Sequence, residues 1–234
     1  MSIDRKWGGF TGVALESFSA LGETRPYSLT DKGAIVAIAL SFSKSSKGES
    51  IAMVTSITLS NPSKIISLEE WMENPPVGTE WVDGELLEKS GMTLRHSEIQ
   101  VNLSFYWRSY KDSSRQGGKV YTDVPCRTNK QGRQPDVAYL TPELVAQYGE
   151  AKVLPQSFPL SAEIVSPTDL AEDVIAKAQE YLQSGGEEVW LVFPESRWII
   201  VTTQTQRLVF ISGEVISTQT VLPGFSIAVD ELLA

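Results

Sequence analysis

The chain has 234 residues, 41% hydrophobic and 21% charged, which fits one globular domain with an appendage and excludes disorder or a coiled coil throughout. Its net charge of −9 disfavours a uniformly nucleic-acid-binding surface, because contacts to phosphate supply much of the affinity for nucleic acid. The single cysteine, Cys126, excludes an internal disulfide and favours a reducing, cytoplasmic location, and the longest apolar run, residues 34–40, is too short to cross a bilayer.

Residues 1–60 differ in pattern from the rest of the chain. They show no sustained helical period and include the low-pattern stretch SFSKSSKGES. Met53 then opens a stretch that reads like an ordinary protein start. We therefore predict that residues 1–60 form an N-terminal leader that is disordered or not native, and that the first 52 residues in particular are either a disordered leader or not part of the native product. The folded domain is expected over residues 65–234.

The first element expected in this domain is a short helix. Residues 67–70, SLEE, have the form of a capping box, and the helix ends before Pro75. Residues 80–88 alternate around Asp83-Gly84, which is a favoured two-residue hairpin turn.

A helix over residues 94–110 follows, with apolar residues at spacings of four and three. It begins a basic segment, because residues 95–133 hold eight basic and three acidic side chains, a net charge of +5. An ordinary solvated helix and hairpin would also have this composition. If the segment binds DNA, we expect the contacts to come from Arg95, Arg108, Lys111, Arg115 and Lys119.

The remainder of the chain is rich in strand patterns. Strands are predicted over residues 119–127, 135–140, 159–165, 188–193, 198–202 and 208–212. A helix over residues 168–183 is predicted with Thr168 as its N-cap and with Leu170, Val174, Ala178 and Tyr181 as its buried stripe. At least four of five tryptophans are assigned to packing: Trp71, Trp81, Trp107, Trp190 and Trp198.

Three side chains form the candidate catalytic set. Asp136 opens one strand, Glu163 lies inside an apolar strand, and Lys177 lies on the following helix. A carboxylate in an apolar strand is costly unless it is paired or metal-bound. Two carboxylates on adjacent strands can share a Mg²⁺ or Mn²⁺ ion, and a nearby lysine can stabilise charge on a phosphate or help to deprotonate a water molecule.

Each of these residues also has an ordinary structural explanation. Asp136 could be a turn aspartate, and Glu163 could be a buried acid paired with an arginine. Lys177 could form a surface ion pair with Asp173, four residues earlier. His96, the only histidine, could contact DNA, act as a base, or cap the helix at whose start it lies. One histidine and one cysteine exclude a zinc site of the usual composition.

The segments that contain these residues resemble the Uma-two family of restriction endonucleases, in the PD-(D/E)XK nuclease superfamily. In family order they are SLEEW at 67–71, EWVDGEL at 80–86, His96, PDVAY at 135–139, AEIVSP at 162–167, DVIAKAQEY at 173–181, EVWLV at 188–192 and LPGF at 222–225. The resemblance implies a restriction-endonuclease-like core, an α/β (α+β) fold with a mixed β-sheet flanked by helices.

The same resemblance implies that Asp136 and Glu163 hold Mg²⁺ or Mn²⁺ and that Lys177 is the catalytic lysine, with Glu80 and His96 in support. In the superfamily's plain E-x-K pattern the lysine follows the glutamate by two residues. Val165 occupies that position here, so the sequence is similar to nucleases whose lysine has moved to the next helix.

The leading hypothesis is therefore a metal-dependent endonuclease that hydrolyses phosphodiester bonds of DNA, with a homodimer as one option by fold analogy. The alternative is a catalytically inactive, nuclease-derived nucleic-acid-binding or regulatory module, favoured by the acidic charge and the missing E-x-K lysine. A third option is an interaction protein that does not touch nucleic acid.

Overall fold

The computed structural model describes residues 36–44, 50–58, 66–89 and 92–234, and the chain divides into two units, Met1–Lys64 and Ile65–Ala234. In the first unit, β1 (Val36–Lys44) pairs antiparallel with β2 (Ser50–Thr58). The rest of the predicted leader lies outside the described residues. The expectation that the leader is disordered or not native therefore stays a prediction.

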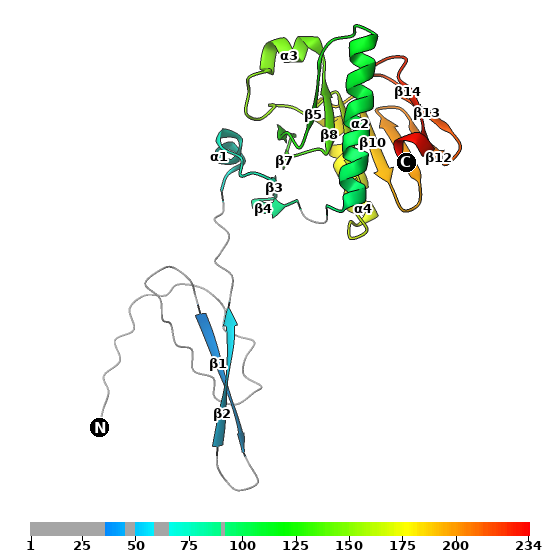
Figure 1. The fold of residues 1–234 in the computed structure, drawn as a ribbon. Coiled ribbons are helices and arrows are strands. Elements are labelled where there is room, and N and C mark those ends of the chain that lie inside the picture. Colours follow the sequence, from blue (N-terminus) through cyan, green and yellow to red (C-terminus); the bar gives the residue numbers. More distant parts are fainter. Residues whose placement is uncertain (1–35, 45–49, 59–65, 90–91) are drawn as a thin grey trace. The chain divides into compact units, whose positions relative to one another are not determined.

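The second unit is built on a six-stranded sheet in the order β12-β11-β10-β9-β8-β5 (Figure 1). Its strands are β5 (Lys119–Thr122), β8 (Val137–Leu140), β9 (Leu160–Ile164), β10 (Glu188–Phe193), β11 (Trp198–Thr203) and β12 (Arg207–Ile211). Strands β9 and β10 are parallel, and the other neighbours are antiparallel. The mixed sheet with flanking helices confirms the predicted fold class.

Two long helices flank this sheet, one on each face. Helix α2 (Leu94–Ser113) packs on one face, and α4 (Ala171–Gln183), which connects the two parallel strands, packs on the other. Strand side chains alternate between the two cores, as the period of a strand requires: Val137 and Tyr139 face α2, whereas Ala138 and Leu140 face α4.

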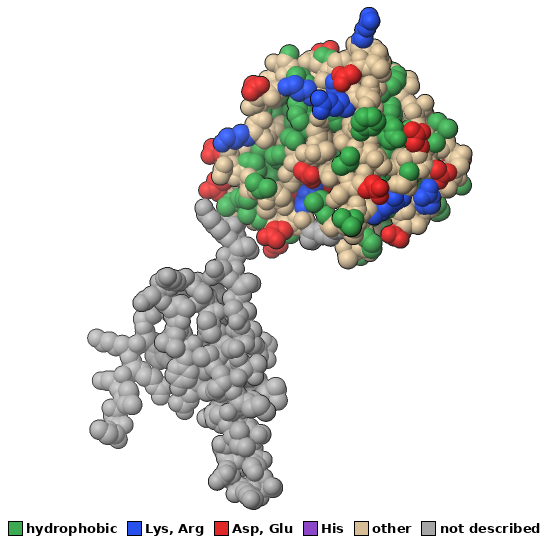
Figure 2. All heavy atoms as spheres, in the orientation of Figure 1, with side chains coloured by type: hydrophobic (Ala, Val, Ile, Leu, Met, Phe, Trp, Pro, Cys, Tyr) green, Lys and Arg blue, Asp and Glu red, His purple; other side chains and the backbone are tan. Residues whose placement is uncertain are grey.

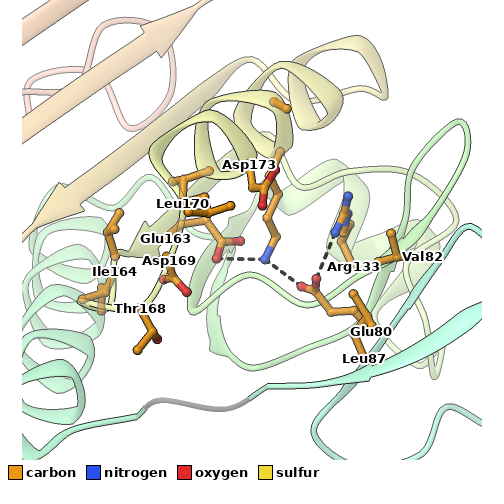
Figure 3. Close-up of a pocket in the computed structure, with 14 residues that line it drawn as sticks. Glu80, Val82, Leu87, Arg133, Glu163, Ile164, Thr168, Asp169, Leu170 and Asp173 are labelled. Carbon is orange, nitrogen blue, oxygen red and sulfur yellow. Dashed lines mark hydrogen bonds and ion pairs between the residues drawn. The ribbon is translucent and has the colours of Figure 1, made fainter. Parts of the chain in front are cut away.

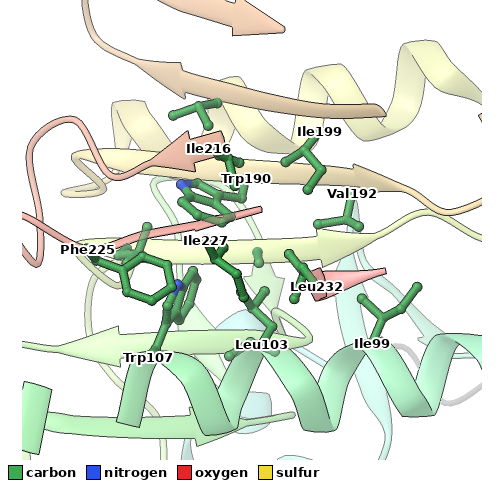
Figure 4. Close-up of a cluster of buried hydrophobic side chains, with 14 of the residues drawn as sticks. Ile99, Leu103, Trp107, Trp190, Val192, Ile199, Ile216, Phe225, Ile227 and Leu232 are labelled. Carbon is green, nitrogen blue, oxygen red and sulfur yellow. The ribbon is translucent and has the colours of Figure 1, made fainter. Parts of the chain in front are cut away.

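The core under α2 is rich in large side chains. Figure 4 shows helix residues Ile99, Leu103 and Trp107 packed towards the strand residues of the sheet. The rings of Trp107 and Trp190 meet edge to face, with centroids 5.6 Å apart. The C-terminal elements close this core: β13 (Val215–Ser217), β14 (Ser226–Ala228) and α5 (Val229–Leu232).

A smaller antiparallel sheet has the order β4-β3-β7-β6. Its strands are β3 (Thr79–Val82), β4 (Glu85–Glu88), β6 (Cys126–Arg127) and β7 (Gly132–Arg133). The predicted turn between β3 and β4 is present, because Asp83 and Gly84 have φ angles of 50° and 95°, both positive as a type I′ turn requires. Helix α1 (Leu68–Glu73) starts with the predicted capping box and packs Trp71 so closely on Gly132 that a Cβ there would lie 2.4 Å from the indole.

The predicted strand over residues 119–127 was wrong in its extent. Strand β5 ends at Thr122, and Asp123 takes a left-handed backbone conformation with φ of 52°. This turn moves the chain from the large sheet to the small one, where β6 begins at Cys126. The short helix α3 (Pro142–Tyr148), capped by Thr141, was not predicted at all.

The start of α4 also differs from its prediction. Leu170 occupies the N-cap position without a side-chain cap, so Thr168 is not the cap. Leu170 is 67% exposed and does not belong to the buried stripe, whereas Val174, Ala178 and Tyr181 are buried as predicted.

The packing assignment of the tryptophans is confirmed. Trp71, Trp107 and Trp190 are fully buried, and Trp81 packs against the small core beside α1 and donates its indole N–H to the carbonyl of Ile66. Trp198 is half exposed. Among the helices in the described part of the chain, none combines the length and the apolar character that a bilayer span requires.

A buried carboxylate ties the C-terminal segment to the sheet. Glu188 is fully buried, and its carboxylate accepts hydrogen bonds from the Trp190 indole at 2.7 Å and from the backbone N–H groups of Gln219 and Thr220, both at 2.8 Å. These donors are removed from water, so losing their acceptor leaves them unsatisfied.

We predict that Glu188→Ala lowers the free energy of unfolding by about 3 kcal/mol or more, because buried donors lose their acceptor. Glu188→Gln keeps one acceptor oxygen and should cost less. Chemical denaturation measures both values, and an Ala variant as stable as the Gln variant would contradict this account of the C-terminal anchor.

Candidate active site

The candidate residues come from separate elements and meet at one end of the large sheet. Strand β9 turns Leu160, Ala162 and Ile164 towards α2, so Glu163 faces α4. The β8–β9 register pairs Val137 with Ala162, and one further step places Asp136 opposite Glu163. The topology therefore brings the two predicted carboxylates to neighbouring positions.

A cavity of about 210 Å³ is lined by all five predicted site residues, which are Glu80, His96, Asp136, Glu163 and Lys177. A second cavity of about 640 Å³ shares three of them, Glu80, Glu163 and Lys177, and extends along the start of α4 (Figure 3). The candidate site is therefore concave and reaches the surface between α4 and the β3–β4 hairpin.

Lys177 lies between two acids. Its ammonium is 3.0 Å from Glu163 Oε2 and 2.7 Å from Glu80 Oε1. Dashed lines mark both ion pairs in Figure 3. Asp173, the alternative partner, does not take part in this pairing. The other oxygen of Glu163 accepts a hydrogen bond of 2.7 Å from the hydroxyl of Tyr181, one turn further along α4.

Glu80 is in turn held by the small sheet. Its Oε2 lies 3.1 Å from the Arg133 guanidinium, and its Oε1 accepts a 3.0 Å hydrogen bond from the backbone N–H of Gln134. Arg133 also pairs with Glu180 at 2.7 Å. Acids and bases thus alternate from Glu180 through to Glu163, so each buried charge has an opposite charge beside it.

Asp136 is held from two sides. Its Oδ2 accepts a 2.7 Å hydrogen bond from the backbone N–H of Ile164, and its Oδ1 lies 2.7 Å from the ammonium of Lys89. Burial would raise the pKa of Asp136, but His96 and Lys89 hold that pKa well below its ordinary value. The carboxylate is therefore ionised at neutral pH.

His96 lies in the first turn of α2, with its Nε2 atom 3.5 Å from Asp136 Oδ1. Neither ring nitrogen has a hydrogen-bond partner with good geometry among the described residues. The helix is capped by Thr93, whose hydroxyl accepts from the backbone N–H of His96, so the capping alternative for the imidazole does not hold. The Asp136 carboxylate raises the pKa of His96 against the opposing effect of burial.

Burial and neighbouring charges shift the pKa values of both members of the ion pair between Glu163 and Lys177. Burial raises the pKa of Glu163 to about 7, with a further increase from Asp136, although Lys177 opposes this. Burial would lower the pKa of Lys177, but Glu163 and Glu80 hold it above its ordinary value. Lys177 is therefore a permanent cation that can donate hydrogen bonds and stabilise negative charge, rather than a base.

The donor set fits a hard divalent ion. Asp136 and Glu163 are carboxylates on one cavity wall, and each already has an ammonium group as its partner. Within the described residues, no group of three or more His, Cys, Asp or Glu side chains is placed to hold a metal ion. Mg²⁺ commonly takes one or two protein carboxylates, with water and phosphate oxygens completing its shell.

The basic residues predicted to bind DNA are not part of this cluster. Arg95 donates to the C-terminal backbone carbonyls of Leu233 and Ala234, and Lys111 is buried and paired with Asp112. The other three side chains are exposed: Arg108, Arg115 and Lys119. Arg108 lies about 18 Å along α2 from His96, at 1.5 Å per residue. Figure 2 shows basic, acidic and apolar side chains interspersed on the face in view.

Several residues of the site were not identified from the sequence. Lys89, Gln100, Arg133 and Glu180 reach it through contacts to residues 36 to 53 positions away in the chain. Local patterns hold no signal for such contacts. The sequence offered one indication: a buried carboxylate such as that of Glu80 needs a cationic side chain beside it, because burying an unpaired charge is costly.

Comparisons with known proteins show the family and the fold of this domain. The family model for Uma2, described as "Putative restriction endonuclease", matches residues 66–230, which confirms the resemblance seen in the sequence motifs. A crystal structure described as "a putative nuclease belonging to DUF820", from Anabaena variabilis ATCC 29413, has a similar fold. Its TM-score is 0.64 at 18% sequence identity, over 72% of this chain and 97% of that chain. No curated protein matches the chain.

The raised pKa of Glu163 predicts an unusual dependence of stability on pH in metal-free buffer. Between about pH 4.5 and pH 7 the folded state holds a proton that the unfolded state releases, so stability falls as pH rises through this window. Above pH 7, Glu163→Gln should therefore be more stable than the wild type, by on the order of 2 kcal/mol.

Denaturation curves in EDTA at pH 5 and pH 8 measure this difference. The advantage of the Gln variant should be small at pH 5 and large at pH 8. An advantage that is the same at both values would show that the charge of Glu163 is already fully compensated by its neighbours.

Proposed function

The chain belongs to the Uma2 family of restriction-endonuclease-like proteins, and on that premise we propose that it is an endonuclease that hydrolyses phosphodiester bonds of DNA with Mg²⁺ or Mn²⁺. The observation that supports this most directly is the placement of Lys177 at 3.0 Å from Glu163, in a cavity that Asp136 also lines. A nuclease of this type needs two acids and a cation at one position, and three separate segments supply them.

Asp136 and Glu163 would hold the divalent ion. Such an ion, when bound, would neutralise charge on the phosphate and polarise it towards attack. The backbone N–H of Ile164 fixes one oxygen of Asp136, and the Tyr181 hydroxyl fixes one oxygen of Glu163, so the two carboxylates are held before any ion arrives. Such preorganisation lowers the cost of forming the site.

Lys177 would donate a hydrogen bond to a phosphate oxygen and stabilise the negative charge that develops in the transition state. Its high pKa suits this role better than proton abstraction. Glu80 keeps the ammonium over the cavity from the side opposite to Glu163, and Lys177 and Arg133 lower the pKa of Glu80 against the effect of burial. Glu80 is thus a positioning residue for the lysine.

DNA would extend from this cavity across the α2 side of the domain. Arg108, Arg115 and Lys119 are exposed, and Arg108 lies about 18 Å along α2 from His96, which is less than the roughly 34 Å that one turn of duplex spans. The alternative proposal is an inactive nuclease-derived module that binds nucleic acid. It is favoured by the lysine partners of both carboxylates, which balance the site without a metal. A cytoplasmic location and a homodimer stay predictions.

We predict that the purified protein, stripped with EDTA, cleaves DNA only after Mg²⁺ or Mn²⁺ is added. Asp136→Asn and Glu163→Gln remove a charge that would hold the metal ion, and Lys177→Met removes the cation that would stabilise charge on the phosphate, so each should lower the cleavage rate about 100-fold or more. Gel-based cleavage of supercoiled, linear and single-stranded DNA measures these rates.

Two exposed residues provide matched controls. Glu172→Gln on α4 and Lys130→Met change the same kinds of charge outside the cavities and should leave cleavage unchanged. Cleavage that persists in the Asp136 and Glu163 variants would refute the assigned site. DNA binding without cleavage or metal affinity would instead favour the inactive module.

For the DNA surface, we predict that replacing Arg108, Arg115 and Lys119 together by Ala weakens binding to all sequences alike. The slope of log affinity against log salt should fall by about 1 for each phosphate group that the variant no longer neutralises. Fluorescence anisotropy at several salt concentrations measures this slope. An unchanged slope would place the DNA on another face of the domain.

A further inference from the structure

Lys89 is a second lysine at the candidate site, and it follows the last residue of β4. Its ammonium contacts three acceptors, which are Asp136 Oδ1 at 2.7 Å, Asp123 Oδ1 at 2.8 Å and the carbonyl oxygen of Gln134 at 3.0 Å. Its side chain is only 16% exposed, and it lines the same 210 Å³ cavity as the two acids. A buried lysine with this many partners is not a solvated surface charge.

The ammonium of Lys89 binds the carboxylate oxygen of Asp136 that a metal ion would need. Asp136 Oδ2 is held by the backbone N–H of Ile164, whereas Oδ1 has only side-chain neighbours, Lys89 and His96, so Oδ1 is the oxygen more readily freed for a cation. Lys89 occupies that oxygen at hydrogen-bond distance. A divalent ion on Oδ1 would stand within a few ångströms of the ammonium, where like charges repel strongly in a site with little water.

We propose that Lys89 competes with the divalent ion for Asp136 Oδ1, so that metal binding displaces its ammonium from this carboxylate. The proposal rests on the proposed function, because it concerns the same metal site. In the absence of metal, Lys89 balances the buried charge of Asp136. The protein thereby stays folded without the ion, at the cost of a lower affinity for it.

The structure provides a place for the displaced ammonium. The side chain of Asp123 is 38% exposed, and its Oδ1 already contacts the Lys89 ammonium. Its Oδ2 accepts a 2.7 Å hydrogen bond from the side-chain amide of Gln100. The four flexible bonds of the lysine side chain allow the ammonium to leave Oδ1 while it keeps its contacts to Asp123 and to the Gln134 carbonyl. Lys177 differs, because Glu80 and Glu163 clamp it on both sides.

The test compares Mn²⁺ binding by the wild type, Lys89→Met and the exposed control Lys130→Met, with free Mn²⁺ measured by electron paramagnetic resonance. We expect Lys89→Met to bind Mn²⁺ about tenfold more tightly or better, and Lys130→Met to match the wild type. The rise in melting temperature on adding Mn²⁺ should also be larger for Lys89→Met, because its metal-free state has lost the balancing ammonium.

A second substitution separates displacement from a general charge effect. Asp123→Asn removes the carboxylate that keeps its contact to the displaced ammonium, so it should weaken Mn²⁺ binding in the wild-type background. In the Lys89→Met background the same substitution should have a clearly smaller effect, since no ammonium needs to move. Equal effects in the two backgrounds would overturn the displacement.

The outcomes also separate this inference from the proposed function. Equal Mn²⁺ affinity, or weaker binding, in Lys89→Met would overturn the competition while metal-dependent cleavage by the wild type still stood. Failure of both proteins to bind Mn²⁺ would overturn the metal site itself, and the competition with it. Tighter binding by Lys89→Met supports the competition whether or not the wild type cleaves DNA.

Discussion

The carboxylate of Glu163, buried on a central strand, is the constraint to which the rest of the site responds. Burial disfavours its ionised form, so the surrounding elements must supply a cation and hydrogen-bond donors. Helix α4 supplies both, with the Lys177 ammonium at 3.0 Å and the Tyr181 hydroxyl at 2.7 Å. The lysine is then compensated by Glu80, and Glu80 by Arg133. One buried acid thus links the large sheet, α4 and the small sheet electrostatically.

The topology explains why these groups meet. A parallel connection requires a crossover, and α4 is that crossover between β9 and β10, so it lies over the face to which Glu163 points. The antiparallel neighbour β8 brings Asp136 to the adjoining position at the sheet end. The hairpin of β3 and β4 closes the cavity from the other side with Glu80 and Lys89. Acidic and lysine side chains therefore alternate around the cavity of about 210 Å³.

The sequence predicted the parts of this arrangement that depend on local pattern or on family motifs. Glu163 stood out because a charge inside an apolar strand requires compensation, and the hairpin at Asp83-Gly84 followed from its turn residues. Lys89 could not be predicted, since its partner Asp136 lies 47 residues away and a lysine after a hairpin usually faces solvent. The end of β5 was also missed, because the left-handed backbone of Asp123 depends on the sheet that the chain enters next.

We propose that Asp136 and Glu163 are ligands of one divalent ion beside Lys177. Anomalous diffraction from crystals soaked in Mn²⁺ tests it most directly, because the ion reveals its own position. The account predicts one strong peak in the cavity with an oxygen of each carboxylate as a ligand, at about 2.0–2.3 Å by the usual geometry of such ions. A peak elsewhere, or bound Mn²⁺ that touches only one of the two acids, would contradict it.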